Sequence, residues 1–387
     1  MGDVQEEAGC GKGRSGGMGM NKVLLEECCE ILDSKRIPIT ASDRNKGQYP
    51  YYGANGIQDY VDDYIFDDEL VLLAEDGGNF GSKDRPIAYR VSGKCWVNNH
   101  AHVLKPKHGL DVDYLCYALM FYDVTGLVNG ATRMKLTQAA MRQMRIPMRE
   151  LPEQLRIVNL LAAVQEIVLK RQQQLSALDD LIKARFIEMF GDTILNPFRW
   201  NKNLLGVVCD VRDGTHDSPQ YFETGYPLVT SKNVTGGKID LTDCSLICEA
   251  DFKKINERSK VDMGDIIMPM IGTIGKPVIV DIEPNFAIKN VSLIKFRLDS
   301  KVLNTYIHAL LQSDYFDDAV ISKVRGGTQK FISLGDIRNL EILVPPMEKQ
   351  KQFTDFALQI DKSKSVIQKS LDETQLLFDS LMQQYFG

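Results

Sequence analysis

The sequence predicts an α+β protein in which two globular mixed α/β domains are separated by two long antiparallel helices that form a coiled coil. Residues 130–191 recur, with many identical positions and no gap, as residues 326–387 at an offset of 196 (326 − 130). Upstream, residues 24–33 match residues 204–213 at an offset of 180 (204 − 24). Solenoid repeats span only about 20–50 residues, so this period indicates duplication of a whole domain with its helix. The two halves are therefore expected to form a pseudo-twofold internal repeat.

Length and repeat together set the predicted domain order. A chain of 387 residues is too long for one ordinary core and fits two or three domains. The predicted segments are a disordered glycine-rich extension at 1–19, a first globular domain at 20–148, a first long helix at 149–192, a second globular domain at 193–344 and a second long helix at 345–387.

The two globular domains have the same predicted order of strand, glycine-rich turn, strand and short helix. The predicted elements are strands at 71–74 and 102–104 with a helix at 113–122 in the first copy, and strands at 265–268 and 292–296 with a helix at 304–316 in the second. Prolines at 147, 152, 345 and 346 precede the long helices, where proline is tolerated. The Asn196-Pro197 pair predicts the turn that leads from the first helix into the second domain.

Two interleaved rows of period seven indicate a coiled-coil seam in each long helix. The predicted seam positions are Ile157, Leu161, Val164, Val168, Leu175, Leu178 and Ile182 in the first helix, and Phe353, Ile360, Ile367, Leu371, Phe378 and Leu381 in the second. Charged residues interrupt both rows, so each helix could instead pack only on its own domain. We favour pairing of the two helices with each other, which would hold the domains apart.

Composition narrows the class of protein. Hydrophobic residues make up 44% and charged residues 25% of the chain, which is typical of a soluble globular protein. The sequence contains no apolar run long enough for a membrane span and no apolar signal core, and its eight cysteines include no CxxC pair. We therefore expect a cytoplasmic protein with reduced cysteines. The net charge of −6 argues weakly against nucleic-acid binding, but residues 129–149 contain five basic residues and no acid.

Recognisable catalytic motifs are absent from the sequence. It lacks a GxxxxGK[ST] phosphate loop and the HExxH, GxSxG and GxGxxG patterns. His100 and His102 are expected on one face of a strand, where a metal site is conceivable, but a solvated or core role is commoner. We predict no metal site and a binding function in place of catalysis.

Polar turns are the candidate binding elements. The turn at 129–135 mirrors the turn at 325–330, and both combine glycine, threonine and basic residues, which suit contact with a phosphate. The turn at 51–56 corresponds to 229–233, where tyrosine, asparagine and serine are available to contact base edges. Ordinary solvated turns remain the alternative in both cases.

In its tandem plan the chain resembles the DNA-specificity subunit of type I restriction–modification systems, over residues 20–387. The matching motifs are Leu-Pro-Glu-Gln-Leu-Arg-Ile-Val at 151–158, Pro-Pro-Met-Glu-Lys-Gln-Lys-Gln-Phe at 345–353, Phe-Gly-Asp at 190–192 with Asn196, Pro197 and Trp200, Gly-Asp-Ile-Ile at 264–267 with the glycine turn at 272–276, and Gly-Gly-Thr-Gln-Lys at 326–330. The first copy departs from this pattern at 75–81 and at 131–133.

The resemblance implies two target-recognition domains that each contact one half of a split double-stranded DNA sequence, and paired helices that set the spacer. It also implies two modification subunits, which would carry S-adenosylmethionine, and restriction subunits as partners, with no cofactor and no catalysis on this chain. The candidate DNA-contact residues are Tyr52, Asn55, Asn79, Asn129, Thr132, Arg133 and Lys135 in the first copy, and Ser231, Lys232, Asn233, Thr273, Lys276, Lys289, Thr328, Gln329 and Lys330 in the second.

Two alternatives remain at this point. A fused methyltransferase or nuclease of the restriction class, such as a fused type II restriction–modification specificity fragment, is disfavoured because the sequence lacks the [DN]-P-P-[YF] signature of adenine methyltransferases. Asn196-Pro197-Phe198 lacks the second proline. A scaffold with no role in DNA binding is the other alternative.

Overall fold

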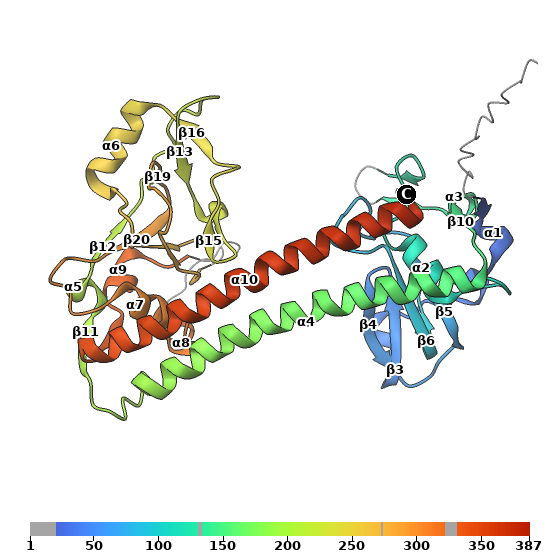
Figure 1. Ribbon diagram of the computed structural model, residues 1–387, viewed down its shortest axis with the longest axis horizontal. Helices are drawn as coiled ribbons and strands as arrows, with labels where there is room; N and C mark the ends of the chain where they lie inside the picture. The colour runs from blue at the N-terminus through green and yellow to red at the C-terminus, as the bar shows by residue number, and fades with distance from the viewer. Residues whose placement is uncertain (1–20, 131–133, 272–273, 322–330) are drawn as a thin grey trace, which may run out of the picture. The chain divides into compact units, whose positions relative to one another are not determined.

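The computed structural model describes residues 21–130, 134–271, 274–321 and 331–387. The chain forms two compact units, the first comprising Met1–Lys170 with Asp372–Gly387 and the second Arg171–Leu371. Both units mix helices with β-sheet, and two continuous 40-residue helices, α4 and α10, each contribute to both units (Figure 1). The predicted α+β fold class is confirmed. Among the described helices, none has both the length and the apolar composition that a membrane crossing requires.

A six-stranded sheet forms the centre of the first unit. Its spatial order is β2 (Cys29–Ile31), β7 (Ala101–Pro106), β5 (Phe66–Ala74), β6 (Ala88–Val97), β3 (Lys46–Gly53) and β4 (Gly56–Val61). All neighbours are antiparallel except the parallel pair β3 and β6. Successive β5 residues alternate between two cores, Val71 and Leu73 on one face and Leu70 and Leu72 on the other, as the two-residue period of a strand requires.

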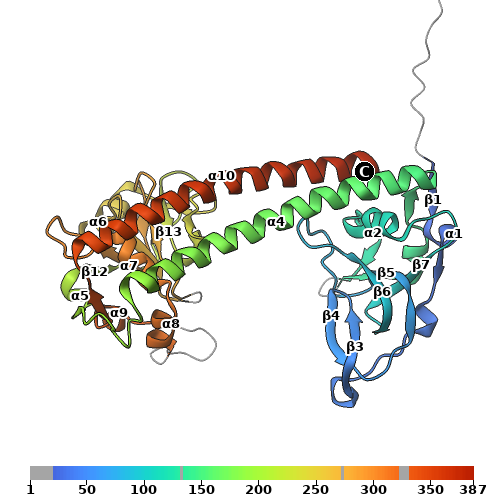
Figure 2. The same cartoon turned by 60° about the horizontal axis from the view of Figure 1, so that its bottom comes forward.

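One face of this sheet is covered by helices. Helix α2 (Val112–Met120) lies between β5 and β6 and the first part of α4 (Leu151–Phe190), and all of them contribute to one apolar core (Figure 2). The smaller elements of the unit are β1 (Lys22–Leu24), α1 (Leu25–Cys28), η1 (Asp33–Lys35), η2 (Ala41–Asp43), β8 (Val128–Asn129), β9 (Lys135–Leu136), α3 (Gln138–Arg142) and β10 (Arg145–Pro147).

The second unit repeats this strand order in two pieces. One sheet has the order β12 (Asp210–Asp213), β20 (Val291–Lys295), β17 (Ile266–Pro269) and β18 (Val278–Ile279), and the other has β16 (Ser245–Ile247), β13 (Tyr226–Val229) and β19 (Ala287–Ile288). β13 pairs in parallel with β19 as β3 pairs with β6. The second unit therefore has the topology of the first, with β18 and β19 in place of the single long strand β6.

The prediction of a single helix at 304–316 is wrong. It forms two helices, α7 (Asn304–Leu311) and α8 (Asp314–Ile321), which are separated at Ser313. The Ser313 hydroxyl donates to the Leu310 carbonyl oxygen at 2.6 Å, a local bond that competes with continuation of the helix. The remaining elements of the unit are β11 (Asn201–Leu204), α5 (Leu205–Val208), η3 (Ser231–Asn233), β14 (Val234–Thr235), β15 (Lys238–Ile239), α6 (Glu249–Ser259), α9 (Leu334–Arg338) and β21 (Glu341–Val344).

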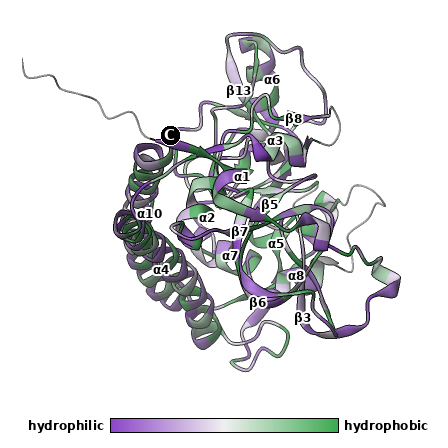
Figure 3. Ribbon diagram, turned by 90° about the vertical axis from the view of Figure 1, so that its right-hand side faces the viewer, coloured by the Kyte–Doolittle hydropathy of each residue, from purple (hydrophilic) through white to green (hydrophobic). Residues whose placement is uncertain are grey.

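The long helices α4 and α10 (Met347–Phe386) pack against each other within both units. Every predicted seam position is buried or half-buried, while apolar and polar residues alternate along both helices (Figure 3). In the first unit, Phe378 of α10 shares a core with Ile157 of α4. In the second unit, the rings of Phe186 and Phe353 have centroids 5.6 Å apart. The start of each helix thus packs near the end of the other, which makes the pair antiparallel and excludes packing of each helix on its own domain alone.

One buried glutamine joins each long helix to its domain. The Gln154 amide accepts from the Asp111 N–H and donates to the carbonyl oxygens of Gly109 and Arg149, each at 2.8 Å. Gln350 makes the same three bonds in the second unit, to the Leu303 N–H and the carbonyl oxygens of Lys301 and Pro345; both glutamines are fully buried. Asp111 and Leu303 are the N-cap residues of α2 and α7, so these amides fix the start of the short helix against the long one.

Candidate nucleic-acid interface

Three polar loops meet at one edge of the first unit's sheet. The Asn55 side chain, in the turn between β3 and β4, donates to the Gly77 carbonyl oxygen at 3.0 Å. The Gly77 N–H in turn donates to the Met134 carbonyl oxygen at 3.4 Å. The structure therefore brings the loops that carry Asn55, Asn79, Asn129 and Lys135 together, although these residues are far apart in the sequence.

The predicted contact residues of this unit differ in exposure. Asn55, Asn129 and Lys135 are exposed. Asn79 is half-buried, and its amide donates to the Pro86 carbonyl oxygen at 3.4 Å. Tyr52 is also half-buried and packs against the sheet's second core with its ring 5.8 Å from that of Tyr89. Tyr52 therefore packs partly into the sheet and keeps part of its surface exposed.

In the second unit, loops at the corresponding sheet edge carry the predicted residues. The Lys289 N–H donates to the Val229 carbonyl oxygen at 2.9 Å, which places Lys289 beside the η3 turn. Its ammonium group donates to the Ser218 hydroxyl at 2.7 Å. Lys232 in η3 and Lys276 after β17 are exposed, and Ser231 is half-buried.

Asn233 has a structural role in the η3 turn. Its side-chain oxygen accepts from both the backbone N–H and the hydroxyl of Thr230, each at 3.0 Å, and the residue is buried. This arrangement orients Lys232 outward. The other predicted residues, Thr132, Arg133, Thr273, Thr328, Gln329 and Lys330, lie outside the described residues.

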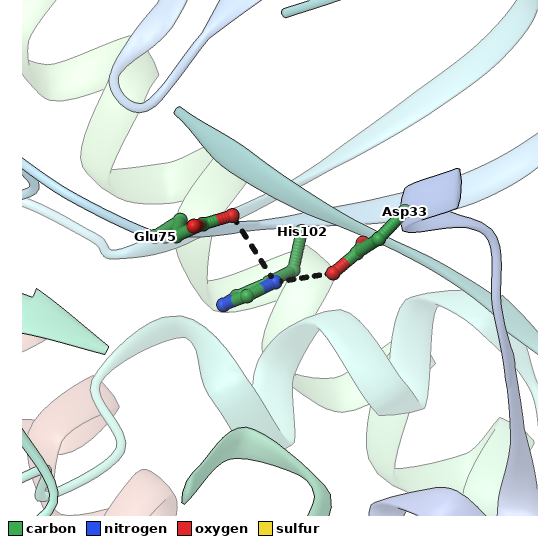
Figure 4. A group of neighbouring side chains, drawn as sticks. All are labelled: Asp33, Glu75 and His102. Atoms are coloured by element: carbon green, nitrogen blue, oxygen red, sulfur yellow. Dashed lines mark hydrogen bonds and ion pairs between the residues drawn. The ribbon is translucent and has the colours of Figure 1, made fainter. Parts of the chain in front are cut away.

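A charged cluster, which sequence reasoning missed, lies beneath the first unit's loops, and Figure 4 shows three of its members, Asp33, Glu75 and His102. The His102 ring is fully buried, with Nδ1 2.7 Å from Asp33 Oδ2 and 3.6 Å from Glu75 Oε2. Arg36 and Lys135 complete the group, at 2.7 Å and 2.9 Å from Glu75. We call these five residues the charged cluster. Desolvation would raise the pKa of Asp33 and of Glu75, but hydrogen bonds from His102 to Asp33 and from Arg36 and Lys135 to Glu75 outweigh it and lower both.

The ligand atoms of Asp33, Glu75 and His102 lie within 4.8 Å of one another, as a metal site would require. Both carboxylates already contact Arg36 and His102, and Glu75 also contacts Lys135, so a dication would have to displace these groups. His100 does not belong to the strand, contrary to prediction. It lies in the turn before β7, with Nδ1 2.6 Å from Asp76 Oδ1, because β7 begins only at Ala101.

The second unit has a different ionic group at its corresponding edge. Asp213, which matches Asp33 in the repeat, is buried at the end of β12 and contacts His216 Nε2 at 2.8 Å and the Arg258 guanidinium. His216 and Arg258 are exposed. The carboxylate of the second unit therefore faces a solvent-accessible histidine and arginine, whereas that of the first faces a buried histidine.

Comparison with known proteins decides the family. A family model described as "Type I restriction modification DNA specificity domain" matches residues 18–178 and again residues 197–374. The chain belongs to this family of type I specificity proteins. Its two matched regions correspond to the two copies of the internal repeat.

Individual members of the specificity family are similar along most of their length. A Haemophilus influenzae protein assigned as a type I restriction enzyme specificity subunit is 28% identical over 367 residues, or 93% of this chain and 92% of that protein. The EcoKI specificity subunit of Escherichia coli is 21% identical over 351 residues, or 81% of this chain and 72% of that protein. The crystal structure of the type I restriction–modification S subunit from M. genitalium has the same fold, with a TM-score of 0.57 at 14% identity and coverage of 95% and 96%.

Proposed function

We propose that this chain is the DNA-recognition subunit of a type I restriction–modification complex and that each unit contacts one half of a bipartite double-stranded target. The observation that carries the proposal is the double match to the specificity domain, at residues 18–178 and 197–374. Two domains of one family in one chain suit two half-sites. Because the loops of the two copies differ, the two half-sites are expected to differ in sequence.

The loop edges of the two units support this assignment. Each presents exposed lysines, Lys135 in the first unit and Lys232 and Lys276 in the second, beside amide or hydroxyl side chains such as Asn55 and Ser231. Lysine neutralises backbone phosphates, while amides and hydroxyls contact base edges. The overall charge of −6 does not oppose DNA binding here. Binding is governed by the local electrostatic field at the sheet edge that carries the polar loops, which we call the contact edge.

The chain would act without catalytic residues of its own. The relatives in the family are specificity subunits by name, and we propose that S-adenosylmethionine binds on two partner modification subunits, with restriction subunits joining them. The long helices would set the spacer between the half-sites and offer a surface for these partners. A fused methyltransferase, the alternative, would transfer methyl groups as the purified chain alone.

Methylation mapping of genomic DNA tests the proposal directly. The chain is expressed with its cognate modification subunit in a host that lacks both, and methyladenine is located by long-read sequencing. We expect one bipartite asymmetric motif with methyladenine in each half, and no motif in cells with the modification subunit alone. An assembled complex that methylates no new motif would contradict the proposal and favour the scaffold alternative.

Lysine variants separate DNA recognition from a scaffold role. Lys135→Ala with Lys276→Ala removes one exposed cation from each unit and should weaken DNA binding by the assembled complex, with equal effect on different sequences. Binding at the level of the unmodified complex would favour the scaffold. The matched control, Lys170→Ala with Lys362→Ala, removes exposed lysines from α4 and α10.

A further inference from the structure

His102 joins three segments of the first unit through its two ring nitrogens. Nδ1 lies 2.7 Å from Asp33 Oδ2, in η1 just after β2, and Nε2 lies 2.9 Å from the Leu136 carbonyl oxygen, in β9. A carbonyl oxygen can only accept a hydrogen bond, and an ionised carboxylate can only accept as well. The geometry therefore fits an imidazolium that donates to both, and it ties β7 to the loop after β2 and to the segment that carries Lys135.

The other members of the charged cluster complete the hydrogen bonding of both carboxylates. Asp33 also accepts from the Val103 N–H and from the Gln138 amide, each at 2.9 Å. Glu75 accepts from Arg36 at 2.7 Å and lies 2.9 Å from the Lys135 ammonium group. These bonds end on β7, on α3, on β9 and on the residue after η1. The cluster is thus a cross-link beneath the loops that carry Asn55, Asn129 and Lys135.

The second unit keeps the backbone of this arrangement and the carboxylate of Asp213, but it has other residues at the positions of His102, Glu75 and Lys135. Ser292 pairs with Asp213 across β12 and β20, in the place that His102 has opposite Asp33. The Ile332 N–H donates to the Met270 carbonyl oxygen at 2.9 Å, as the Leu136 N–H donates to that of Glu75 at 2.7 Å. By this register Met270, which is buried, stands where Glu75 stands in the first unit, and Phe331 stands where Lys135 stands.

We propose that His102 is a positioning residue for one half-site only, because it holds the first unit's contact loops through Asp33, Glu75 and the Leu136 carbonyl group, whereas the second unit has Ser292 and Met270 at the positions of His102 and Glu75. The inference rests on the proposed function and adds to it a residue that sets specificity without touching DNA. A glutamine amide carries its N–H donors on a single nitrogen, so it cannot bridge Asp33 and the Leu136 carbonyl oxygen as the two ring nitrogens do. The β9 segment then gains freedom, and Asn129, the strand partner of Lys135, contacts mismatched bases nearly as well as matched ones.

The test uses the complete chain with its modification subunit in cells. His102→Gln is compared with Ser292→Ala, the matched change at the same register position of the second unit. Long-read sequencing measures methylation at cognate sites and at sites with one mismatched base in either half. We expect His102→Gln to raise the mismatched-to-cognate ratio about tenfold in one half, equivalent to about 1.4 kcal/mol, and to leave the other half within about twofold. Ser292→Ala should change neither half by more than about twofold.

The ratio separates positioning from stability. A purely structural role would lower the amount of active complex and total methylation, but the surviving complex would discriminate as before. An unchanged ratio in both halves would therefore overturn the inference, and so would equal loosening of both halves. Glu75→Gln, which keeps the side-chain shape, should loosen the same half as His102→Gln and remains informative if the histidine variant fails to fold. Absence of any bipartite motif with the unmodified chain would instead refute the proposed function itself.

Discussion

Replacing either buried glutamine by alanine should destabilise its own unit by a similar amount. Gln154→Ala removes the bonds to the Asp111 N–H and to two carbonyl oxygens in the first unit. Gln350→Ala removes the same set, which begins at the Leu303 N–H, in the second. Both side chains are fully buried, so water can replace the lost partners only if it enters the space that alanine leaves.

The expected cost follows from the number of bonds. Each intramolecular hydrogen bond contributes about 1 kcal/mol net, and a buried N–H without a partner costs about 1–3 kcal/mol. Three lost bonds therefore predict about 3 kcal/mol per variant, which is large against the total stability of a typical domain, about 5–15 kcal/mol. Because the two glutamines have matching partners, the two costs should agree within about 1 kcal/mol.

Urea denaturation of the full chain measures the loss, and hydrogen–deuterium exchange assigns it to a unit. The amide protons of Asp111 in Gln154→Ala and of Leu303 in Gln350→Ala should exchange faster, each without effect on the other unit. Gln172→Ala and Gln352→Ala, at exposed positions of the same helices, serve as controls with little expected change. Costs below about 1 kcal/mol, or faster exchange spread over both units, would refute the reasoning.

Three further predictions concern stability, pH and the spacer. Tyr114→Phe and Tyr306→Phe each remove a buried bond from the tyrosine hydroxyl to a strand carbonyl oxygen at 2.9 Å and should cost about 1 kcal/mol each in urea denaturation. The folded-state pKa values of Asp33 and Glu75 are lowered. The stabilisation that these carboxylates contribute is therefore present above the ordinary carboxyl pKa of about 4 and is lost as pH falls below it. Glu75→Gln should reduce the dependence of unfolding free energy on pH in this acid range. Matched seven-residue insertions in α4 and α10 should lengthen the spacer in the methylated motif, and a changed half-site would contradict the role proposed for the helices.

The sequence could predict features that depend on regular periodicity. Rows of period seven identified the faces that α4 and α10 bury, because a helix places every seventh residue on nearly the same side. The match of Gln154 to Gln350 was visible in the repeat, but its role was not. Their partners include the carbonyl oxygens of Gly109 and Lys301, which lie 45 and 49 residues upstream. No local sequence pattern predicts a bond of that kind.

The charged cluster could not be predicted from the sequence, because it depends on the order of strands in the sheet. Asp33 follows β2, Glu75 follows β5, and His102 lies in β7. The spatial order of these strands, β2-β7-β5, differs from their order in the chain. Each residue alone is a polar side chain near a strand end, which is common on any surface. Only the non-sequential order places the histidine between the two carboxylates, and a period-two pattern carries no information on which strands become neighbours.

The two units differ most in the side chains of their loops, which the shared hydrogen bonds between helices and strands do not constrain. The bonds that define the frame end largely on backbone atoms, as at Gln154 and Tyr114 and at their counterparts Gln350 and Tyr306. These bonds constrain the positions of the strands and helices but not the side chains of the loops at the contact edge. The same register can therefore place Glu75 in one unit and Met270 in the other. A frame of this kind lets the loop side chains of one unit change while the other unit, and the long helices, keep their interactions.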